Sequence, residues 1–111
     1  MTIYQNCLSE ATNYTDRDAY VSDLALSSLW GDEEGADVPE ERLEWLGQLW
    51  DAVHRSVKEI ARDAGMSQRK LAERFAVPYR TAEYWCSNPT SCALYVRLMM
   101  QECLGLLRRD V

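Results

Sequence analysis

The sequence has few of the residues from which enzyme active sites and metal sites are built. It holds one histidine, His54, and its four cysteines form no Cys-x-x-Cys pair. Structural zinc sites usually draw their nitrogen and sulfur ligands from such close pairs. A glycine-rich phosphate loop and a nucleophile spaced for activation by a base are also missing. We therefore expect no enzymatic activity, no metal and no cofactor, and cysteines that stay reduced and pack as small apolar side chains.

Long apolar runs are missing as well. No stretch approaches the roughly 20 apolar residues that a membrane-spanning helix needs. The N-terminal sequence MTIYQNCLSE has neither the basic region nor the apolar core of a signal peptide. With 47% apolar and 27% charged residues among 111, the composition is that of a globular protein of one domain with an appended segment. We expect it in the cytoplasm, away from the membrane.

Basic residues are scarce in the first half of the chain. Residues 1–52 contain only two, Arg17 and Arg42, against twelve acidic residues, whereas residues 53–111 contain ten basic and six acidic ones. The net charge of -6 therefore comes from the first half. Salt screens exposed charges beyond roughly 8–10 Å, so the positive second half can still approach a polyanion.

The spacing of apolar residues predicts an all-α fold in two parts. Residues 1–38 are expected to form an acidic helical segment with a linker, and residues 39–111 a helical domain. In the first part, Thr15 is expected to cap a helix over residues 16–30, because a threonine hydroxyl can accept a bond from the first helical turn. Gly31 would end this helix. Residues before Thr15 give no pattern that assigns a structure.

The second part begins with a long helical pattern. Apolar residues recur in steps of three and four from Leu43 to Ala64, with no break signal before Gly65. The pattern favours one long or gently kinked helix. Two helices that meet near Ser56 are the alternative.

Residues 66–85, MSQRKLAERFAVPYRTAEYW, have the pattern of two short helices joined by a tight turn. Ser67 is expected to cap the first helix. Pro78 is expected in the first turn of the second helix, where its missing N–H costs nothing, and the helix would end near Ser87. Such a helix-turn-helix, here over residues 67–87, places its second helix in the major groove of DNA.

The polar faces of these two helices supply the candidate site. Arg80 can bond bidentately to guanine, and Gln68 and Arg69 stand where the first helix begins, a place suited to gripping a phosphate. A solvated helix surface is the alternative for each of them. The candidate DNA-binding residues are Ser67, Gln68, Arg69, Pro78, Tyr79, Arg80, Tyr84 and Ser87.

Residues 57–107 resemble the phage-repressor, Cro-like helix-turn-helix family. The resemblance is carried by Ser67-Gln68, Leu71–Phe75, Val77–Thr81 and Trp85, and by the helix around Tyr95–Met99. It implies that Gln68 binds a phosphate, that Pro78, Tyr79 and Arg80 read bases, and that Tyr84 faces the groove one turn later. The family often has glycine where this chain has Ala76, and if φ is positive there the alanine costs about 1 kcal/mol.

A last helix is expected over residues 92–108, apolar around most of its circumference. Such a helix should meet two surfaces, one of them either the N-terminal half of the same chain or a second chain. Together these patterns predict a sequence-specific regulator that occupies a promoter or operator as a homodimer on double-stranded DNA. The alternative is an antitoxin- or adaptor-like interaction module, in which the helix-turn-helix is a scaffold and the acidic half binds a basic protein partner.

Overall fold

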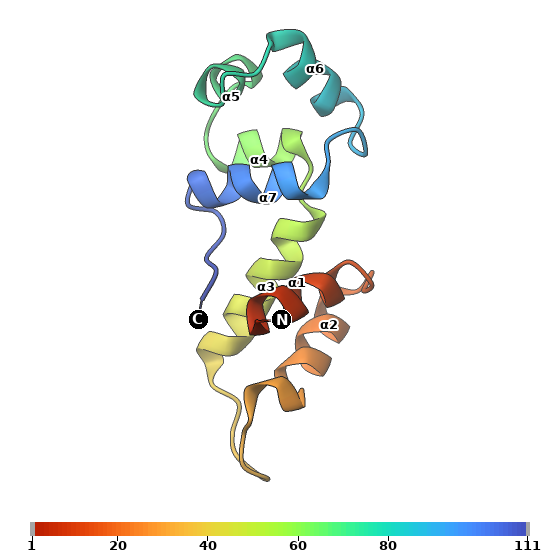
Figure 1. Cartoon of the computed structure of the whole chain (residues 1–111), viewed down its shortest axis with the longest axis vertical. Coiled ribbons are helices and arrows are strands. Elements are labelled where there is room, and N and C mark those ends of the chain that lie inside the picture. Colours follow the sequence, from red (N-terminus) through yellow and green to blue (C-terminus); the bar gives the residue numbers. More distant parts are fainter. Residues whose placement is uncertain (1, 111) are drawn as a thin grey trace. The chain divides into compact units, whose positions relative to one another are not determined.

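The computed structural model describes residues 2–110, and within that range every element is a helix (Figure 1). The expected all-α class is confirmed. The elements are α1 (Ile3–Ala11), α2 (Arg17–Ala25), the 3-10 helix η1 (Ser28–Trp30), α3 (Glu40–His54), α4 (Val57–Asp63), α5 (Gln68–Arg74), α6 (Tyr79–Ser87) and α7 (Leu94–Cys103).

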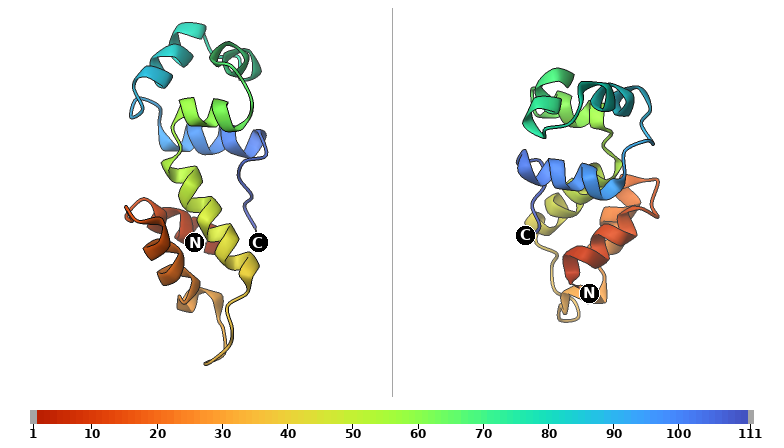
Figure 2. Two further views of the ribbon diagram at one scale, coloured as in Figure 1. Left: turned by 180° about the vertical axis from the view of Figure 1, so that it is seen from behind. Right: turned by 45° about the horizontal axis from the view of Figure 1, so that its top comes forward.

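The chain divides into two compact units. The first unit runs up to His54 and includes the C-terminal segment from Arg108 onward, and the second unit is Arg55–Leu107. The sequence pattern had suggested a division near residue 38. In the structure, α3 follows that point and packs on α1 and α2 (Figures 1 and 2).

The first unit has an aromatic core. Tyr20 and Trp45 are buried together with leucines of α3, and the Tyr20 hydroxyl donates to the carbonyl oxygen of Cys7 at 2.7 Å. The indole N–H of Trp45 donates to the carbonyl oxygen of Arg108 at 3.1 Å. This bond fastens the C-terminal segment to α3 within the unit, and it gives the buried indole its polar partner.

Two expectations for this unit need correction. The predicted helix over residues 16–30 ends at Ala25, and η1 follows after a break at Leu26. The N-cap of α2 is Asp16 and not Thr15. The Asp16 carboxylate accepts from the amide of Ala19 at 3.3 Å. Gly31 does end the run, with a left-handed φ of 65° after η1.

Arg42 anchors the acidic loop between η1 and α3. Its side chain is almost fully buried and donates to the carbonyl oxygen of Ala25 at 3.1 Å and to the Asp32 carboxylate at 2.9 Å. The guanidinium carbon also lies 4.3 Å from the centre of the Trp30 ring. These bonds hold the pKa of Asp32 below its usual range. One of the two basic residues of the acidic half is thus used inside the fold.

The expectation of one long helix up to Gly65 is wrong, and the alternative break near Ser56 is present. α3 ends at His54, and α4 begins at Val57. The Ser56 hydroxyl accepts from the amide of Glu59 at 3.2 Å, and the Glu59 carboxylate accepts from the amide of Ser56 at 3.1 Å. This reciprocal capping box offers the backbone an alternative to helical hydrogen bonding, so it starts a new helix although the apolar spacing continues.

The second unit is built from α4 to α7, with α4 and α7 lying side by side in the views of Figures 1 and 2. Its core is a cluster of small and medium apolar side chains, against which Phe75 and Trp85 pack while half-buried. The buried members are Val57, Ile60, Ala61, Leu71, Cys86 and Cys92.

Three helices of this unit end with the same C-terminal hydrogen bond, in which an amide donates to the carbonyl oxygen five residues earlier. We call this bond a closure. The amide of Met66 donates to the carbonyl oxygen of Ala61 at 2.8 Å after α4, and the equivalent six-residue closures follow α5 and α7. Each closure requires a residue of positive φ, which is Gly65 after α4 and Gly105 after α7. After α5 it is Ala76, with φ 53°.

The last helix is shorter than the expected 92–108. It begins after Ala93, whose backbone is extended, and ends at Cys103. Leu98 and Met100 are buried, whereas Tyr95 and Met99 keep 69% and 61% of their surface exposed. α7 therefore has a buried side and an exposed apolar side.

Candidate nucleic-acid interface

The eight candidate residues lie in α5, in the turn, in α6 and at the N-cap of α5. The Ser67 hydroxyl accepts from the amide of Lys70 at 3.1 Å, which confirms the predicted cap. The turn closes when the amide of Val77 donates to the carbonyl oxygen of Ala72 at 2.9 Å. Pro78 is the residue just before α6 and not part of its first turn. Its carbonyl oxygen accepts from the amides of Thr81 and Ala82.

Buried apolar side chains, of which Ala72 and Ala82 are small, pack between α5 and α6. Leu71 and Ala72 of α5 are buried, as are Ala82 and Cys86 of α6. Ala82 is fully buried, and Trp85 is half-buried against the core cluster. These buried residues define the inward sides of α5 and α6. The opposite side of α6 is the one that a partner can reach.

The open side of α6 carries Arg80, Tyr84 and Ser87. Together with Glu83 and Asn88 they line a shallow hollow of about 460 Å³. Positions 80, 84 and 87 follow the i, i+4, i+7 rule for one side of a helix. Tyr84 keeps 59% of its surface exposed, so a large ring and a guanidinium stand together on the surface.

A second group joins the beginnings of the two helices. The guanidinium carbon of Arg69 lies 4.5 Å from the centre of the Tyr79 ring. A cation over an aromatic face is attracted by the ring quadrupole, so Tyr79 restrains the direction of Arg69. Ser67 and Pro78 are exposed beside this pair, and Gln68 is half-buried.

The structure thus brings the candidates together as two groups. One is the α6 hollow with Arg80, Tyr84 and Ser87, and the other is the Arg69–Tyr79 pair. The sequence had placed Tyr79 with Arg80 and Tyr84, but the hollow is lined without Tyr79.

Charge on the second unit favours an anionic partner. The unit has eight Lys and Arg residues against five Asp and Glu residues. Two of the five acids, Glu59 and Asp63, are ion-paired with arginines. Four exposed cations lie along α5 and α6: Arg69, Lys70, Arg74 and Arg80.

Sequence reasoning missed Glu83. Contacts to phosphates require hydrogen-bond donors, and an ionised carboxylate only accepts, so its residue type did not indicate a DNA contact. The helical spacing contained the signal, since Glu83 lies three residues after Arg80 on the same side of α6.

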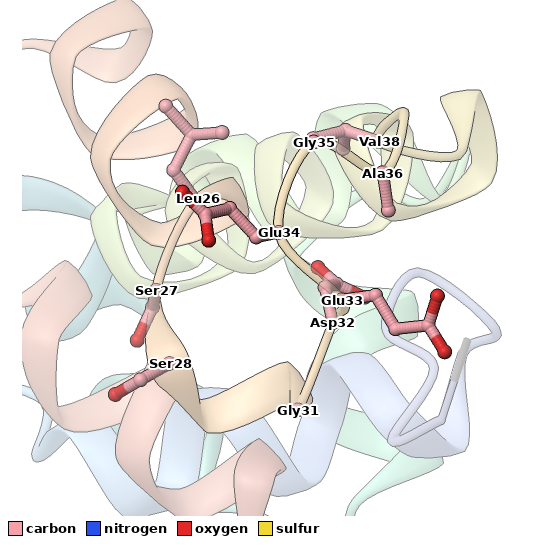
Figure 3. A pocket seen from close by; sticks show the side chains of 10 residues that line it. All are labelled: Leu26, Ser27, Ser28, Gly31, Asp32, Glu33, Glu34, Gly35, Ala36 and Val38. Atoms are coloured by element: carbon pink, nitrogen blue, oxygen red, sulfur yellow. The ribbon is translucent and has the colours of Figure 1, made fainter.

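A second hollow, of about 340 Å³, lies at the acidic loop of the first unit (Figure 3). Asp32 is bound to Arg42, and Figure 3 shows the Glu33 and Glu34 side chains extending in different directions from the loop. Between residues 2 and 110, no three histidine, cysteine or carboxylate side chains are grouped so that they could hold a metal ion.

The thiols differ in exposure and all four are free. Cys7, Cys86 and Cys92 are buried, and Cys103 is exposed on α7. Burial raises the pKa of Cys7 to about 11, and it also raises the pKa values of Cys86 and Cys92. The buried thiols therefore stay protonated and unreactive near neutral pH.

Comparison with protein-family models, with curated proteins and with solved structures gives no match for this chain. In the part of the chain that the structure describes, no helix has the length and apolar character to cross a bilayer.

Proposed function

We propose that the chain is a sequence-specific DNA-binding regulator of transcription, with α5 and α6 as its helix-turn-helix. α6 lies in the major groove and α5 braces it from behind. The observation that carries the proposal is the open side of α6, where Arg80, Tyr84 and Ser87 line one hollow. Bound at a promoter or operator, the protein acts by occupancy.

The residues of the two groups take different roles in this proposal. Arg80 reads guanine through O6 and N7, and Tyr84 and Ser87 contact the groove beside it. Arg69, held by Tyr79, neutralises a backbone phosphate, and Ser67, Gln68 and Pro78 lie next to that contact. Phosphate contacts of this kind position the protein, whereas base contacts specify the sequence.

A homodimer is part of the proposal. Modules of this class commonly bind two half-sites about one helical turn apart, so each copy reads half of an operator. The exposed Tyr95 and Met99 of α7 supply apolar surface for contact with a second copy.

Selection of binding sequences from a random duplex pool tests the proposal. We expect an enriched, roughly palindromic site for the native chain, and loss of preference at one base pair per half-site for Arg80→Ala. That loss should be about 1–3 kcal/mol, because it removes one bidentate contact. A folded chain that enriches no sequence at low salt would contradict the proposal.

The acidity of the first unit favours a second candidate function. That unit has four Lys and Arg residues against thirteen Asp and Glu residues. In this alternative the chain is an antitoxin- or adaptor-like module, the α5–α6 pair is a scaffold, and the acidic unit binds a basic protein partner. Salt-sensitive capture of one such partner, unaffected by Arg80→Ala and without any duplex preference, would favour it.

A further inference from the structure

Glu83 is the single acidic residue of α6, and it stands on the side that the proposed function assigns to DNA. It is exposed and lines the hollow with Arg80 and Tyr84. One helical turn separates it from Arg80, a spacing at which opposite charges often pair. In the described part of the chain, however, the ion pairs and side-chain hydrogen bonds do not include Arg80 or Glu83. Both groups are therefore available to a partner.

We infer that Glu83 is a specificity-determining residue that reads cytosine beside the guanine read by Arg80; this inference rests on the proposed function. An ionised carboxylate has acceptors and no donors, so it is repelled by phosphates and needs a donor on the partner. In the major groove, cytosine presents only the amino donor at N4. Adenine also presents an amino group, but its N7 acceptor lies beside that group and opposes the carboxylate.

The spacing along α6 sets the distance between the two bases. Three residues of helix advance about 4.5 Å, and one base-pair step is about 3.4 Å. Arg80 and Glu83 therefore reach neighbouring base pairs. The half-site should contain a guanine and a cytosine at adjacent positions, with their strands set by the direction of α6 in the groove.

The carboxylate also acts against wrong sequences. Guanine O6 and thymine O4 are acceptors in the major groove, so either base opposite Glu83 leaves its charge without a donor. The unpaired charge weakens binding to these wrong sequences, whereas the contact between Arg80 and its guanine strengthens binding to the right one.

Duplex selection with Glu83→Gln tests the inference. Glutamine keeps the shape of the side chain and pairs bidentately with adenine N6 and N7. We expect the variant to retain the guanine preference of Arg80 and to change the neighbouring preference from cytosine to adenine. The variant should bind the native site about 5- to 150-fold more weakly than it binds the site with adenine in place of cytosine. This ratio corresponds to one base contact.

Glu73→Gln is the matched control, because Glu73 is an exposed acid on α5 outside the hollow. It should strengthen binding to every duplex by a similar factor and leave the base preference unchanged. If Glu83→Gln behaves in the same way, Glu83 is only a solvated charge and the inference is overturned, while the proposed DNA binding stands. If the folded native chain prefers no duplex at low salt, both the inference and the proposed function fail.

Discussion

Ala76 has a backbone conformation that an alanine side chain opposes. Its φ of 53° is left-handed, and the two equivalent closures of the second unit use Gly65 and Gly105. The alanine Cβ crowds the following carbonyl oxygen in this region of backbone space. The turn between α5 and α6 is thus held in place by the packing of Leu71, Ala72 and Ala82 and not by its own preference.

Replacing Ala76 with glycine should stabilise the second unit. We expect the free energy of unfolding of Ala76→Gly to rise by up to about 1 kcal/mol, because relief of the left-handed strain outweighs the added freedom of the unfolded chain. Urea denaturation followed through the NMR signal of the Trp85 indole measures this within the second unit. Ala64→Gly is the control: Ala64 has φ -86°, so glycine there should destabilise by about 0.5–1 kcal/mol. Equal losses in both variants would show that the turn carries no strain.

At the scale of the helices, the sequence predicted what depends on local signals. The Ser67 cap and the end of α6 at Ser87 are where the pattern placed them. α1 was not found, because it is a nine-residue helix that buries only Cys7 and Ala11. Its start was nonetheless signalled by the capping box of Thr2 and Gln5.

The break between α3 and α4 was not the favoured prediction, because the apolar periodicity continues across it. Apolar periodicity reports which residues face inward, and two successive helices can keep the same period across a short break. The reciprocal bonds between Ser56 and Glu59 mark the break, and they are local enough to be read as a Ser-x-x-Glu pattern. For the candidate site, the motif located the open face of α6, but the hollow and the place of Glu83 within it required the three-dimensional arrangement.

The capping box also gives α4 a dependence on pH. The amide of Ser56 donates to the Glu59 carboxylate, and this bond is the main reason why the pKa of Glu59 lies below its ordinary value. A depressed pKa in the folded state means stability that is present above the unfolded pKa of about 4.3 and is lost as the pH falls through the folded pKa.

Glu59→Gln should therefore flatten the acid limb of the stability curve. Glutamine can still accept from the amide of Ser56, so we expect only a small loss of unfolding free energy near pH 7. From about pH 5 downward the native chain should lose stability more steeply than the variant. Urea midpoints measured between pH 3 and pH 7 test this. Parallel curves for the two proteins would show that the Glu59 charge does not contribute.

For the whole molecule, charge is divided between the two units. The acidic residues belong mainly to the first unit, and the second unit carries a small positive excess. If α5 and α6 meet DNA as proposed, affinity should depend on the local cations and on salt, although the net charge of the chain is negative.

Arg69→Ala tests this dependence. We expect weaker binding to all duplexes by a similar factor, with the base preference unchanged, because a phosphate contact carries no sequence information. The slope of log affinity against log salt concentration should fall by about 0.9, the contribution of one phosphate contact. Binding titrations at several salt concentrations measure both quantities. Lys58→Ala, which removes an exposed cation from α4, should leave the slope nearly unchanged. A changed base preference in Arg69→Ala would assign Arg69 to base reading instead.

The uneven exposure of the thiols gives the native chain a single position for covalent labelling. Cys103 is exposed on α7, whereas burial keeps the other three thiols protonated and shielded. A maleimide fluorophore at neutral pH should therefore attach at Cys103 alone, without any cysteine substitution. The anisotropy of that dye would then report the rotational size of the particle carrying α7, and so follow its assembly with duplexes of chosen sequence in real time.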